Sequence, residues 1–443
     1  MIVMKFGGSS VADASRICHV IDIVKTQLEK KPALVLSAMG DTTDHLLEAG
    51  SAALSLGKVE ISRVEKLHLE TIKTLKLPVQ NEVIDLLSEL KRLLSGVALI
   101  REFTPRTKDY LVSFGERLST RIMAAALKSK GVNAKAFDAW ELGFLSNSNY
   151  GYAELLKESW ELIPKKILPL IKDNVLPVIT GFIAKDEKGG VTTLGRGGSD
   201  LSATMIAAAC GAKEAQVWKD VDGILTADPR IVKSARPVKS VTYEEAAELA
   251  YYGAQVLHPR AMQPCIKTGT PVLVKNSYNI EAHGTKIEPA ALAEINKRPP
   301  VRAISSRLNV TLVDIVSTRM LGQYGFLAEV FSIFSRHSVS IDMVATSEVS
   351  VSLTLDASHD LSEIKKELSK IASVEIKTGK AIISIICNVK RSSEILARAF
   401  RTCQLVAVPV QMVSQGASKV NISFIVNDTE AEETVRALHL DFF

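Results

Sequence analysis

Short apolar segments that end in glycine-rich turns and alternate with helical patterns run through residues 1–285. The first, Val3–Phe6, is stopped by Gly7-Gly8 and followed by a helical pattern of apolar residues. Further strand-like segments lie at residues 33–36, 132–137, 175–180 and 216–219. This alternation predicts an α/β domain whose mainly parallel sheet is covered by helices on both faces. Ligands of such sheets bind beyond the carboxyl ends of the strands, where these turns lie.

Residues 45–104 interrupt this alternation with a stretch rich in Leu, Glu and Lys at helical spacing. The stretch predicts an all-helical insert within the domain formed by residues 1–285. A further helix is expected over Glu116–Lys130, with Glu116 in its first turn. An acid in that position either favours the helix dipole or accepts a substrate ammonium group.

From residue 286 the pattern changes, and residues 286–306 have the composition of a linker that ends in a strand. Residues 307–379 follow the order strand, helix, strand, strand, helix, strand, which is the ferredoxin-like plan. Residues 380–443 nearly repeat this order but lack the last strand. Val301–Ser305 is expected to supply it, so that the first unit is inserted within the second.

The charge balance argues against nucleic-acid binding. The chain of 443 residues, long enough for two to four domains, has 54 Lys and Arg against 49 Asp and Glu, a net charge of +5. Residues 301–443 carry 15 basic and 15 acidic side chains, so the excess lies in the first 300 residues. A mildly basic N-terminal part suits small anionic ligands.

The sequence also gives no sign of a membrane span, an export signal or a zinc site. No stretch approaches the roughly 18 apolar residues of a membrane helix, and Met1 leads directly into a strand-like segment. The five Cys are scattered without a CxxC motif, and none of the eight His has HExxH or HxH spacing. We therefore expect a cytoplasmic protein with reduced thiols and no zinc site built from His or Cys.

The first motif with chemical potential is Lys5-Phe6-Gly7-Gly8-Ser9-Ser10. Adjacent glycines let the backbone approach a phosphate, and the preceding Lys can place its ammonium on a transferring phosphoryl group. The spacing matches neither the P-loop nor the dinucleotide-binding fingerprint. The alternative is a plain turn after a strand.

The second motif spans Thr192–Asp200 and sets Arg196 among three glycines. An Arg in that setting suits bidentate capture of a carboxylate or a phosphate. Ser199 is expected to cap the helix that follows, and Asp200 to favour its dipole. A purely capping role is the alternative to a binding role.

The third motif, Trp218–Arg230, is an acid-rich turn after a strand. Asp220 could bind Mg²⁺ directly or through water, or contact a nucleotide, and Arg230 could turn toward phosphates. A solvated turn is an equal alternative. His258, directly before Pro259, is expected to be a structural hydrogen-bonding group and not a ligand.

Taken together and in this order, the motifs resemble those of the aspartate kinases, which belong to the amino acid kinase family. The resemblance covers nearly the whole chain, because the two ferredoxin-like units resemble the nested ACT domains of that enzyme. The segments that carry it are Lys5–Val11, Gly115-Glu116, Thr192–Asp200, Asp220–Arg230 and Val256–Pro259.

This resemblance implies the three-layer amino-acid-kinase fold and phosphorylation of the side-chain carboxylate of L-aspartate by ATP. The product, 4-phospho-L-aspartate, is the first intermediate toward lysine, threonine, methionine and diaminopimelate. A carboxylate is already ionised at neutral pH, so the reaction needs no general base. Catalysis then consists of positioning and of neutralising phosphoryl charge, with Mg²⁺ carried by the ATP phosphates.

Site residues are assigned by matching position. Lys5, Arg196 and Asp200 are expected to be catalytic. The residues expected to hold aspartate are Ser37, Ala38, Thr43, Glu116, Phe182, Arg196, Gly197, Gly198, Ser199 and Asp200. The residues expected to border ATP are Lys5, Gly7, Gly8, Ser9, Lys219, Asp220, Leu225, Arg230, Gln255 and Val256. Leu225 stands where related enzymes often have an aromatic residue and Gln255 where a Lys is common, which predicts weaker nucleotide binding.

The C-terminal half resembles the lysine-inhibited class of aspartate kinases. The residues expected to bind lysine are Met320, Gln323, Phe326, Leu327, Ser340, Ile341, Asp342, Thr346, Ser347 and Glu348. Asp342 and Glu348 are expected to pair with the effector ammonium; a polar strand edge is the alternative. Paired ACT domains imply a homodimer with lysine near the subunit interface, and a tetramer is the alternative assembly.

Two other functions fit the sequence less well. A kinase of the same family acting on glutamate, acetylglutamate or a nucleotide monophosphate normally lacks tandem ACT domains. An amino-acid sensor with an inactive kinase domain is disfavoured, because Lys5, Glu116, Arg196 and Asp200 are all retained. The primary prediction is a lysine-regulated aspartate kinase.

Overall fold

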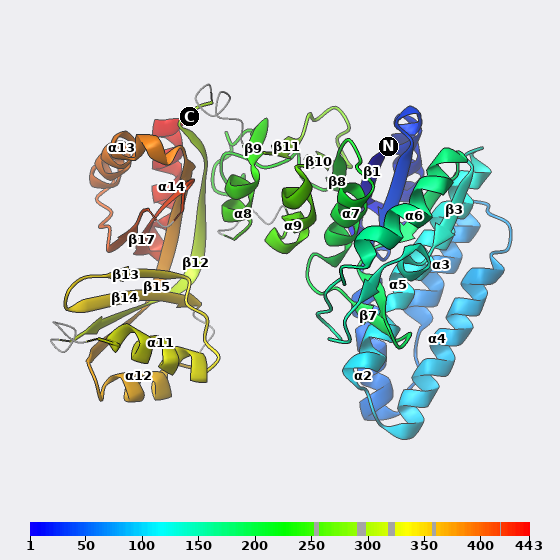
Figure 1. Ribbon diagram of the computed structural model, residues 1–443, viewed down its shortest axis with the longest axis horizontal. Helices are drawn as coiled ribbons and strands as arrows, with labels where there is room; N and C mark the ends of the chain where they lie inside the picture. The colour runs from blue at the N-terminus through cyan, green and yellow to red at the C-terminus, as the bar shows by residue number, and fades with distance from the viewer. Residues whose placement is uncertain (252–256, 290–297, 318–323, 357–359, 417) are drawn as a thin grey trace. The chain divides into compact units, whose positions relative to one another are not determined.

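The computed structural model describes residues 1–251, 257–289, 298–317, 324–356, 360–416 and 418–443 (Figure 1). The chain packs as two compact units. We call the first the N-terminal unit; it comprises Met1–Ile224, Lys239–Tyr243 and Val256–Pro289. The second, the C-terminal unit, comprises Leu225–Val238, Glu244–Gln255 and Ala290–Phe443.

The N-terminal unit is built on an eight-stranded sheet in the order β3-β5-β2-β1-β8-β10-β11-β9. Its strands are β1 (Ile2–Phe6), β2 (Pro32–Leu36), β3 (Ala134–Phe137), β5 (Leu176–Thr180), β8 (Ala215–Lys219), β9 (Ser240–Thr242), β10 (Val272–Asn276) and β11 (Thr285–Glu288). All neighbouring pairs are parallel except β10 and β11. A small second sheet joins β4 (Leu145–Ser146), β6 (Ile183–Asp186) and β7 (Val191–Thr193). The predicted mainly parallel α/β sheet is confirmed.

Helices cover both faces of this sheet. On one face α5 (Pro105–Ser129) packs on β3 and β5 with α1 (Ala14–Lys25) beside it. On the other, α7 (Gly198–Ala209) packs on β1 and β8, flanked by α6 (Ser159–Lys172) and α9 (Pro259–Thr268). Every residue of β1, β2 and β5 is buried, which explains why these strands are apolar apart from Lys5 and Thr180.

The predicted helical insert consists of α2 (Thr42–Leu56), α3 (Ser62–Thr74) and α4 (Asn81–Ile100). The sequence predicts that the next helix starts at Glu116. This prediction is wrong, since α5 begins at Pro105. Thr104 caps α5 by accepting the Thr107 N–H at 3.2 Å, and a Pro at the first helical position is favourable. Glu116 therefore lies in the middle of a long helix, and the first-turn explanation for this acid is wrong.

Gly115 lets α5 come close to the turn after β2. A Cβ atom at this position would lie 2.6 Å from the Ala38 Cβ. We expect Gly115→Ala to destabilise the protein, because overpacking costs about 1–3 kcal/mol and outweighs the gain of about 1 kcal/mol in helix propensity. Thermal unfolding measures the difference.

Gly96 is the matched control, because it also lies inside a helix but a Cβ there would meet nothing within 4 Å. Gly96→Ala is expected to raise the melting temperature through helix propensity alone. A Gly115→Ala protein as stable as the Gly96→Ala protein would contradict the argument from close approach.

The C-terminal unit has one six-stranded sheet in the order β13-β14-β12-β15-β17-β16. Its elements are β12 (Val301–Val316), α11 (Phe326–Arg336), β13 (Met343–Thr346), β14 (Ser350–Asp356), α12 (Ser362–Leu368), β15 (Ser373–Cys387), α13 (Ser392–Leu405), β16 (Met412–Ser414), β17 (Asn421–Asn427) and α14 (Asp428–Phe442). Figure 1 shows α11 and α12 at one end of the long strands and α13 and α14 at the other.

The two ferredoxin-like repeats share their central strands. Residues 301–305 and 308–316, expected as separate strands, form the single strand β12, which pairs with β15 along its length. The junction is an irregularity and not a turn: the pairing register shifts between Arg307 and Val310, and Asn309 has a φ of 56°. Val301 pairs with Cys387, so this segment extends the second repeat's part of the sheet.

Part of the connection between β8 and β9 packs with the C-terminal unit. Ala227 and Val232 share a hydrophobic cluster with residues of α14, and the Thr226 Oγ1 lies 2.9 Å from the His439 Nε2. The Arg436 guanidinium donates to the Ile231 carbonyl at 3.0 Å. The packing units therefore do not follow the simple chain order that the sequence suggested.

Within the described residues, no helix is both long enough and apolar enough to cross a lipid bilayer.

Candidate functional site

A cavity of about 520 Å³ lies in the N-terminal unit, beyond the carboxyl ends of β1, β2 and β5. It is lined by Lys5, Gly8, Ser37, Ala38, Gly40, Thr43, Glu116, Phe182, Gly195, Arg196, Gly197, Gly198, Ser199 and Asp200. The structure thus brings together all ten residues that the sequence assigned to aspartate. It adds Gly40 and Gly195, whose positive φ values of 49° and 72° mark them as turn residues.

The floor of the cavity holds a buried pair of opposite charges. The Lys5 Nζ lies 2.7 Å from the Asp200 Oδ1, and the Lys219 Nζ lies 3.5 Å from the Asp200 Oδ2. Burial alone would raise the pKa of Asp200, but the two lysines outweigh it and hold that pKa below its usual value. Two cations share one anion, so this end of the cavity carries a net positive charge suited to phosphate.

Glu116 has the opposite electrostatic situation. Its Oε1 accepts the Ala38 N–H at 3.2 Å, and its buried Oε2 has no hydrogen-bond partner in the described part of the chain. Burial raises the pKa of Glu116 to about 8, against the smaller lowering effects of the Ala38 N–H and Lys5. The unsatisfied oxygen can accept a hydrogen bond from a substrate ammonium group, whose positive charge would favour the ionised form of Glu116.

The loop between β7 and α7 forms one wall of the cavity. Gly197, with a φ of 73°, precedes α7 and takes the N-cap position that was predicted for Ser199. The prediction for Ser199 is therefore wrong: this residue lies in the first turn, where its Oγ accepts the Ser37 hydroxyl at 3.1 Å. The N-cap residue has a left-handed conformation, which favours glycine, and this explains why Gly197 and not Ser199 takes the position.

Phe182 faces this loop from the end of β5. Its φ of 68° is strained for a residue with a side chain, and its N–H and carbonyl are fixed by Ser202 and Leu194. Gly198 accommodates it, because a Cβ at that position would lie 2.8 Å from the Phe182 ring. Gly198 is thus required by close packing at the site.

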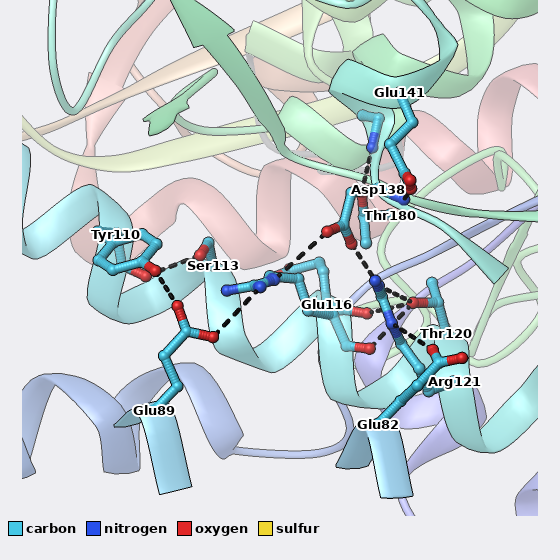
Figure 2. A network of polar contacts seen from close by, with 12 residues as sticks. Glu82, Glu89, Tyr110, Ser113, Glu116, Thr120, Arg121, Asp138, Glu141 and Thr180 are labelled. Carbon is cyan, nitrogen blue, oxygen red and sulfur yellow. Dashed lines mark hydrogen bonds and ion pairs between the residues drawn. The ribbon is translucent and has the colours of Figure 1, made fainter. Parts of the chain in front are cut away.

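A network of ion pairs holds the far side of α5 (Figure 2). Arg117 pairs with Glu89 at 3.5 Å and with Asp138 at 3.4 Å, and Arg121 pairs with Asp138 and with Glu82. These contacts join α5 to α4 and to the turn after β3. They fix the helix that presents Glu116, and sequence reasoning missed them because the partners are far apart along the chain.

The glycine turn after β1 is supported by the segment that follows β10. The Ser10 Oγ lies 2.8 Å from the Ser277 Oγ, and the Tyr278 hydroxyl donates to the Ser9 carbonyl at 3.1 Å. A Cβ on Gly8 would lie 2.9 Å from the Ala38 carbonyl oxygen, so this position requires glycine. Ser277 and Tyr278 were not predicted, and no local motif marks them.

The other residues predicted to border the nucleotide are placed differently. Lys219 is the last residue of β8 in the N-terminal unit, and the exposed Asp220 follows it. Leu225 and Arg230 pack with the C-terminal unit, where the Arg230 guanidinium pairs with Asp228 at 2.6 Å. Their nucleotide role stays a prediction. Gln255 and Val256 lie outside the described residues.

Comparison with known proteins decides the family. Residues 1–276 match the model of the amino acid kinase family, and residues 313–360 and 383–442 match an ACT domain. Aspartokinase 1, chloroplastic, from Arabidopsis thaliana is 51% identical over 458 residues, which cover all of this chain and 80% of the relative. The chain belongs to the aspartokinases, within the amino acid kinase family.

Two crystal structures of Escherichia coli aspartokinase III are similar to this aspartokinase over its full length. The complex with lysine and aspartate, called the T-state, has 33% identity and a TM-score of 0.81 and is covered to 99%. The complex with aspartate and ADP, called the R-state, has 32% identity and a TM-score of 0.80 and is covered to 100%. The predicted family and fold are confirmed.

The predicted regulatory residues of the aspartokinase lie around α11 and β13. Phe326 and Leu327 begin α11, and Ser340, Ile341 and Asp342 precede β13. Thr346 ends β13, and Ser347 and Glu348 lie in the turn between β13 and β14. Asp342 is already engaged, because the Arg307 guanidinium lies 3.0 Å from its Oδ2. Met320 and Gln323 lie outside the described residues.

Proposed function

We propose that this aspartokinase transfers the γ-phosphoryl group of ATP to the side-chain carboxylate of L-aspartate, giving 4-phospho-L-aspartate. One observation carries the proposal: a single cavity presents the unsatisfied carboxylate of Glu116 and the buried ammonium of Lys5. The ammonium group of an amino acid can bind to Glu116. Aspartate also has a side-chain carboxylate that can lie near Lys5, which leaves its α-carboxylate for another cation of the cavity.

The residues of the cavity divide the substrate between them. We assign the substrate ammonium to Glu116 and the α-carboxylate to Arg196, whose guanidinium can bind it in bidentate fashion. The hydroxyls of Ser37, Thr43 and Ser199 line the same cavity and can complete the contacts. The side-chain carboxylate is then directed toward Lys5.

Lys5 performs the electrostatic part of the reaction. The substrate carboxylate is ionised at neutral pH, so no residue has to remove a proton. Lys5, oriented by Asp200, neutralises negative charge that develops on the transferring group, and Lys219 adds to the positive potential. Because its ammonium is already held in a buried site, little reorganisation is needed during the reaction.

The site fits a nucleotide phosphate and its metal. The donor set is basic, with two lysines against one aspartate, and the glycines after β1 allow close approach of backbone N–H groups. When bound, ATP with Mg²⁺ supplies the phosphoryl group and further positive charge. We assign Mg²⁺ to the ATP phosphates, as the resemblance to the aspartate kinases implies. Within the described residues no three His, Cys, Asp or Glu side chains cluster as metal ligands.

Regulation by lysine is part of the proposal. The ACT match and the similarity to an E. coli enzyme crystallised with lysine support a lysine site near α11 and β13. We propose a homodimer through the ACT domains, with a tetramer as the alternative. For this chain we propose a cytoplasmic location, although relatives named chloroplastic share about half of its residues.

ADP release tests the reaction directly. With ATP and Mg²⁺, we expect turnover with aspartate, little with glutamate and none without an amino acid, and lysine should inhibit the aspartate reaction. Hydroxylamine trapping of the acyl phosphate would identify the product. Turnover independent of aspartate, or preference for glutamate, would contradict the proposed substrate; no turnover with any acceptor would favour a sensor with an inactive kinase domain.

A further inference from the structure

Asp109 and Arg260 have no role in the proposed reaction, but both bind the backbone just before the loop that carries Arg196. Residues 151–153 and 193–194 lie side by side, joined by a hydrogen bond from the Ala153 N–H to the Thr193 carbonyl at 2.8 Å. The second of these segments leads directly into the loop of Arg196. Asp109 binds the N–H groups of this pair of segments, and Arg260 binds its carbonyls.

Asp109 contributes from α5. Its Oδ2 accepts the N–H groups of Gly151 and Thr193, each at 2.8 Å, and its Oδ1 accepts the Thr193 hydroxyl at 2.9 Å. Asp109 is 2% exposed, and its two carboxylate oxygens accept all three of these hydrogen bonds. Asp109 lies seven residues, or two helical turns, before Glu116, so both occupy the same face of α5.

Arg260 contributes from the start of α9. Its guanidinium donates to the Leu194 carbonyl at 2.7 Å and to the Ala153 carbonyl at 2.6 Å. It also lies 4.2 Å from the centre of the Tyr152 ring. That ring packs directly on Gly195, where a Cβ atom would come within 2.4 Å of it.

We propose that Asp109 and Arg260 are positioning residues that fix the loop carrying Arg196 relative to Glu116. Arg260 and Asp109 bind adjacent residues, Leu194 and Thr193, immediately before that loop. Loss of either contact frees the start of the loop. The distance between Arg196, which we assign to the α-carboxylate, and Glu116, which we assign to the ammonium group, is then no longer fixed. The inference rests on the proposed function, because it concerns the same aspartate site.

The geometry assigns the effect to substrate binding. Asp109 and Arg260 do not line the cavity, and Lys5, which we assign to the transferring group, lies on β1. A displaced loop should therefore raise the KM for aspartate much more than it lowers kcat or raises the KM for ATP. Misplacement of a binding group by about 1 Å can cost on the order of 100-fold in efficiency.

The test compares Arg260→Met with Lys267→Met in the full chain. Met keeps the apolar bulk of Arg260 but cannot donate to the two carbonyls. Lys267 lies on the same helix but contacts α6, since its ammonium lies 4.5 Å from the centre of the Trp160 ring. We expect the aspartate KM to rise roughly 10- to 100-fold for Arg260→Met, with the ATP KM within about twofold, and the Lys267→Met protein to match the parent.

Two further variants keep the inference testable if Arg260→Met folds poorly. Arg260→Lys retains one hydrogen bond and should give an intermediate aspartate KM. Asp109→Asn can accept the Gly151 and Thr193 N–H groups through its oxygen and donate to the Thr193 hydroxyl, so it should stay near the parent, whereas Asp109→Ala should resemble Arg260→Met.

The outcomes separate this inference from the proposed function. A parent enzyme without aspartate turnover would refute the function itself. An active parent whose Arg260→Met and Asp109→Ala variants keep the parental aspartate KM would refute the positioning role alone. A fall in kcat with similar rises in the KM for aspartate and the KM for ATP, together with a lowered melting temperature, would also overturn it. Such a result is what the loss of a merely structural contact would give.

Discussion

Lys5→Met is expected to lower kcat by about 10²- to 10³-fold while leaving the aspartate KM within a few-fold of the parent. The magnitude is that of removing one preorganised group that stabilises charge in a transition state, about 3–4 kcal/mol. The Lys5 ammonium is 2.7 Å from Asp200 and lines the cavity, so it is oriented before substrate binds. Steady-state ADP release at saturating ATP and aspartate measures the loss.

The buried partner of Lys5 complicates this variant and supplies its control. Without Lys5, Lys219 at 3.5 Å is the one ion-pair partner that Asp200 keeps among the described residues. Removal of one member of a buried ion pair costs about 3–5 kcal/mol of stability. Lys5→Met with Asp200→Asn removes both charges and should recover much of the lost stability. If the double variant also recovers kcat, Lys5 serves only to compensate Asp200, and the catalytic assignment is wrong.

Aspartate affinity is expected to increase from pH 6 to pH 8 and then level off. The raised pKa of Glu116, about 8 in the empty site, means that this carboxyl is protonated at neutral pH. Binding of a substrate ammonium favours the ionised form and so lowers that pKa, which requires a proton to leave on binding. Below pH 8 the affinity should therefore fall by up to about tenfold for each pH unit.

Titration calorimetry checks both the rise of aspartate affinity with pH and the release of a proton on binding. Aspartate binding measured at pH 6.5, 7.5 and 8.5, in two buffers of different ionisation enthalpy, gives the affinity and the number of protons released. Glu116→Gln should bind aspartate weakly, with no proton release and little pH dependence. Affinity that is flat over this range in the parent enzyme would show that Glu116 does not bind the ammonium group.

Stability supplies an independent control for Glu116. With a folded pKa raised above the unfolded value near 4.5, this carboxyl holds a proton in the folded state that the unfolded chain has lost. Its contribution to stability is therefore lost as the pH rises from about 4.5 through 8. Glu116→Gln removes this cost, so its melting temperature should exceed that of the parent at pH 8.5, which also shows that the variant is folded.

The sequence by itself determined the elements and the strand ends at which the ligands bind. Apolar segments that are buried on both faces, each followed by a glycine turn, gave the parallel sheet and the position of the cavity, because strand period and turn chemistry are local properties. Six of the ten residues assigned to aspartate lie in motifs that the sequence shows, namely Glu116, Arg196, Gly197, Gly198, Ser199 and Asp200. The other four, Ser37, Ala38, Thr43 and Phe182, were assigned only through the resemblance to the aspartate kinases, and they line the same cavity.

Local reasoning failed where a motif residue has its role set by packing. The sequence predicts a helix that starts at Glu116, but α5 starts at Pro105, and Gly115 lies inside it, where it makes room for Ala38. Ser199 was expected to cap α7, but the left-handed conformation of Gly197 takes that position. In both places glycine serves a close approach or a positive φ that only the folded backbone reveals.

Only the tertiary structure decided which distant residues support the site. The Arg117 network, the bonds from Asp109 to Thr193 and those from Arg260 to Leu194 join residues that are many positions apart. Such contacts depend on how helices and loops pack over the sheet, and no local pattern encodes that register. The raised pKa of Glu116 also comes from the tertiary structure, because the burial of this carboxyl in the folded protein is what raises it.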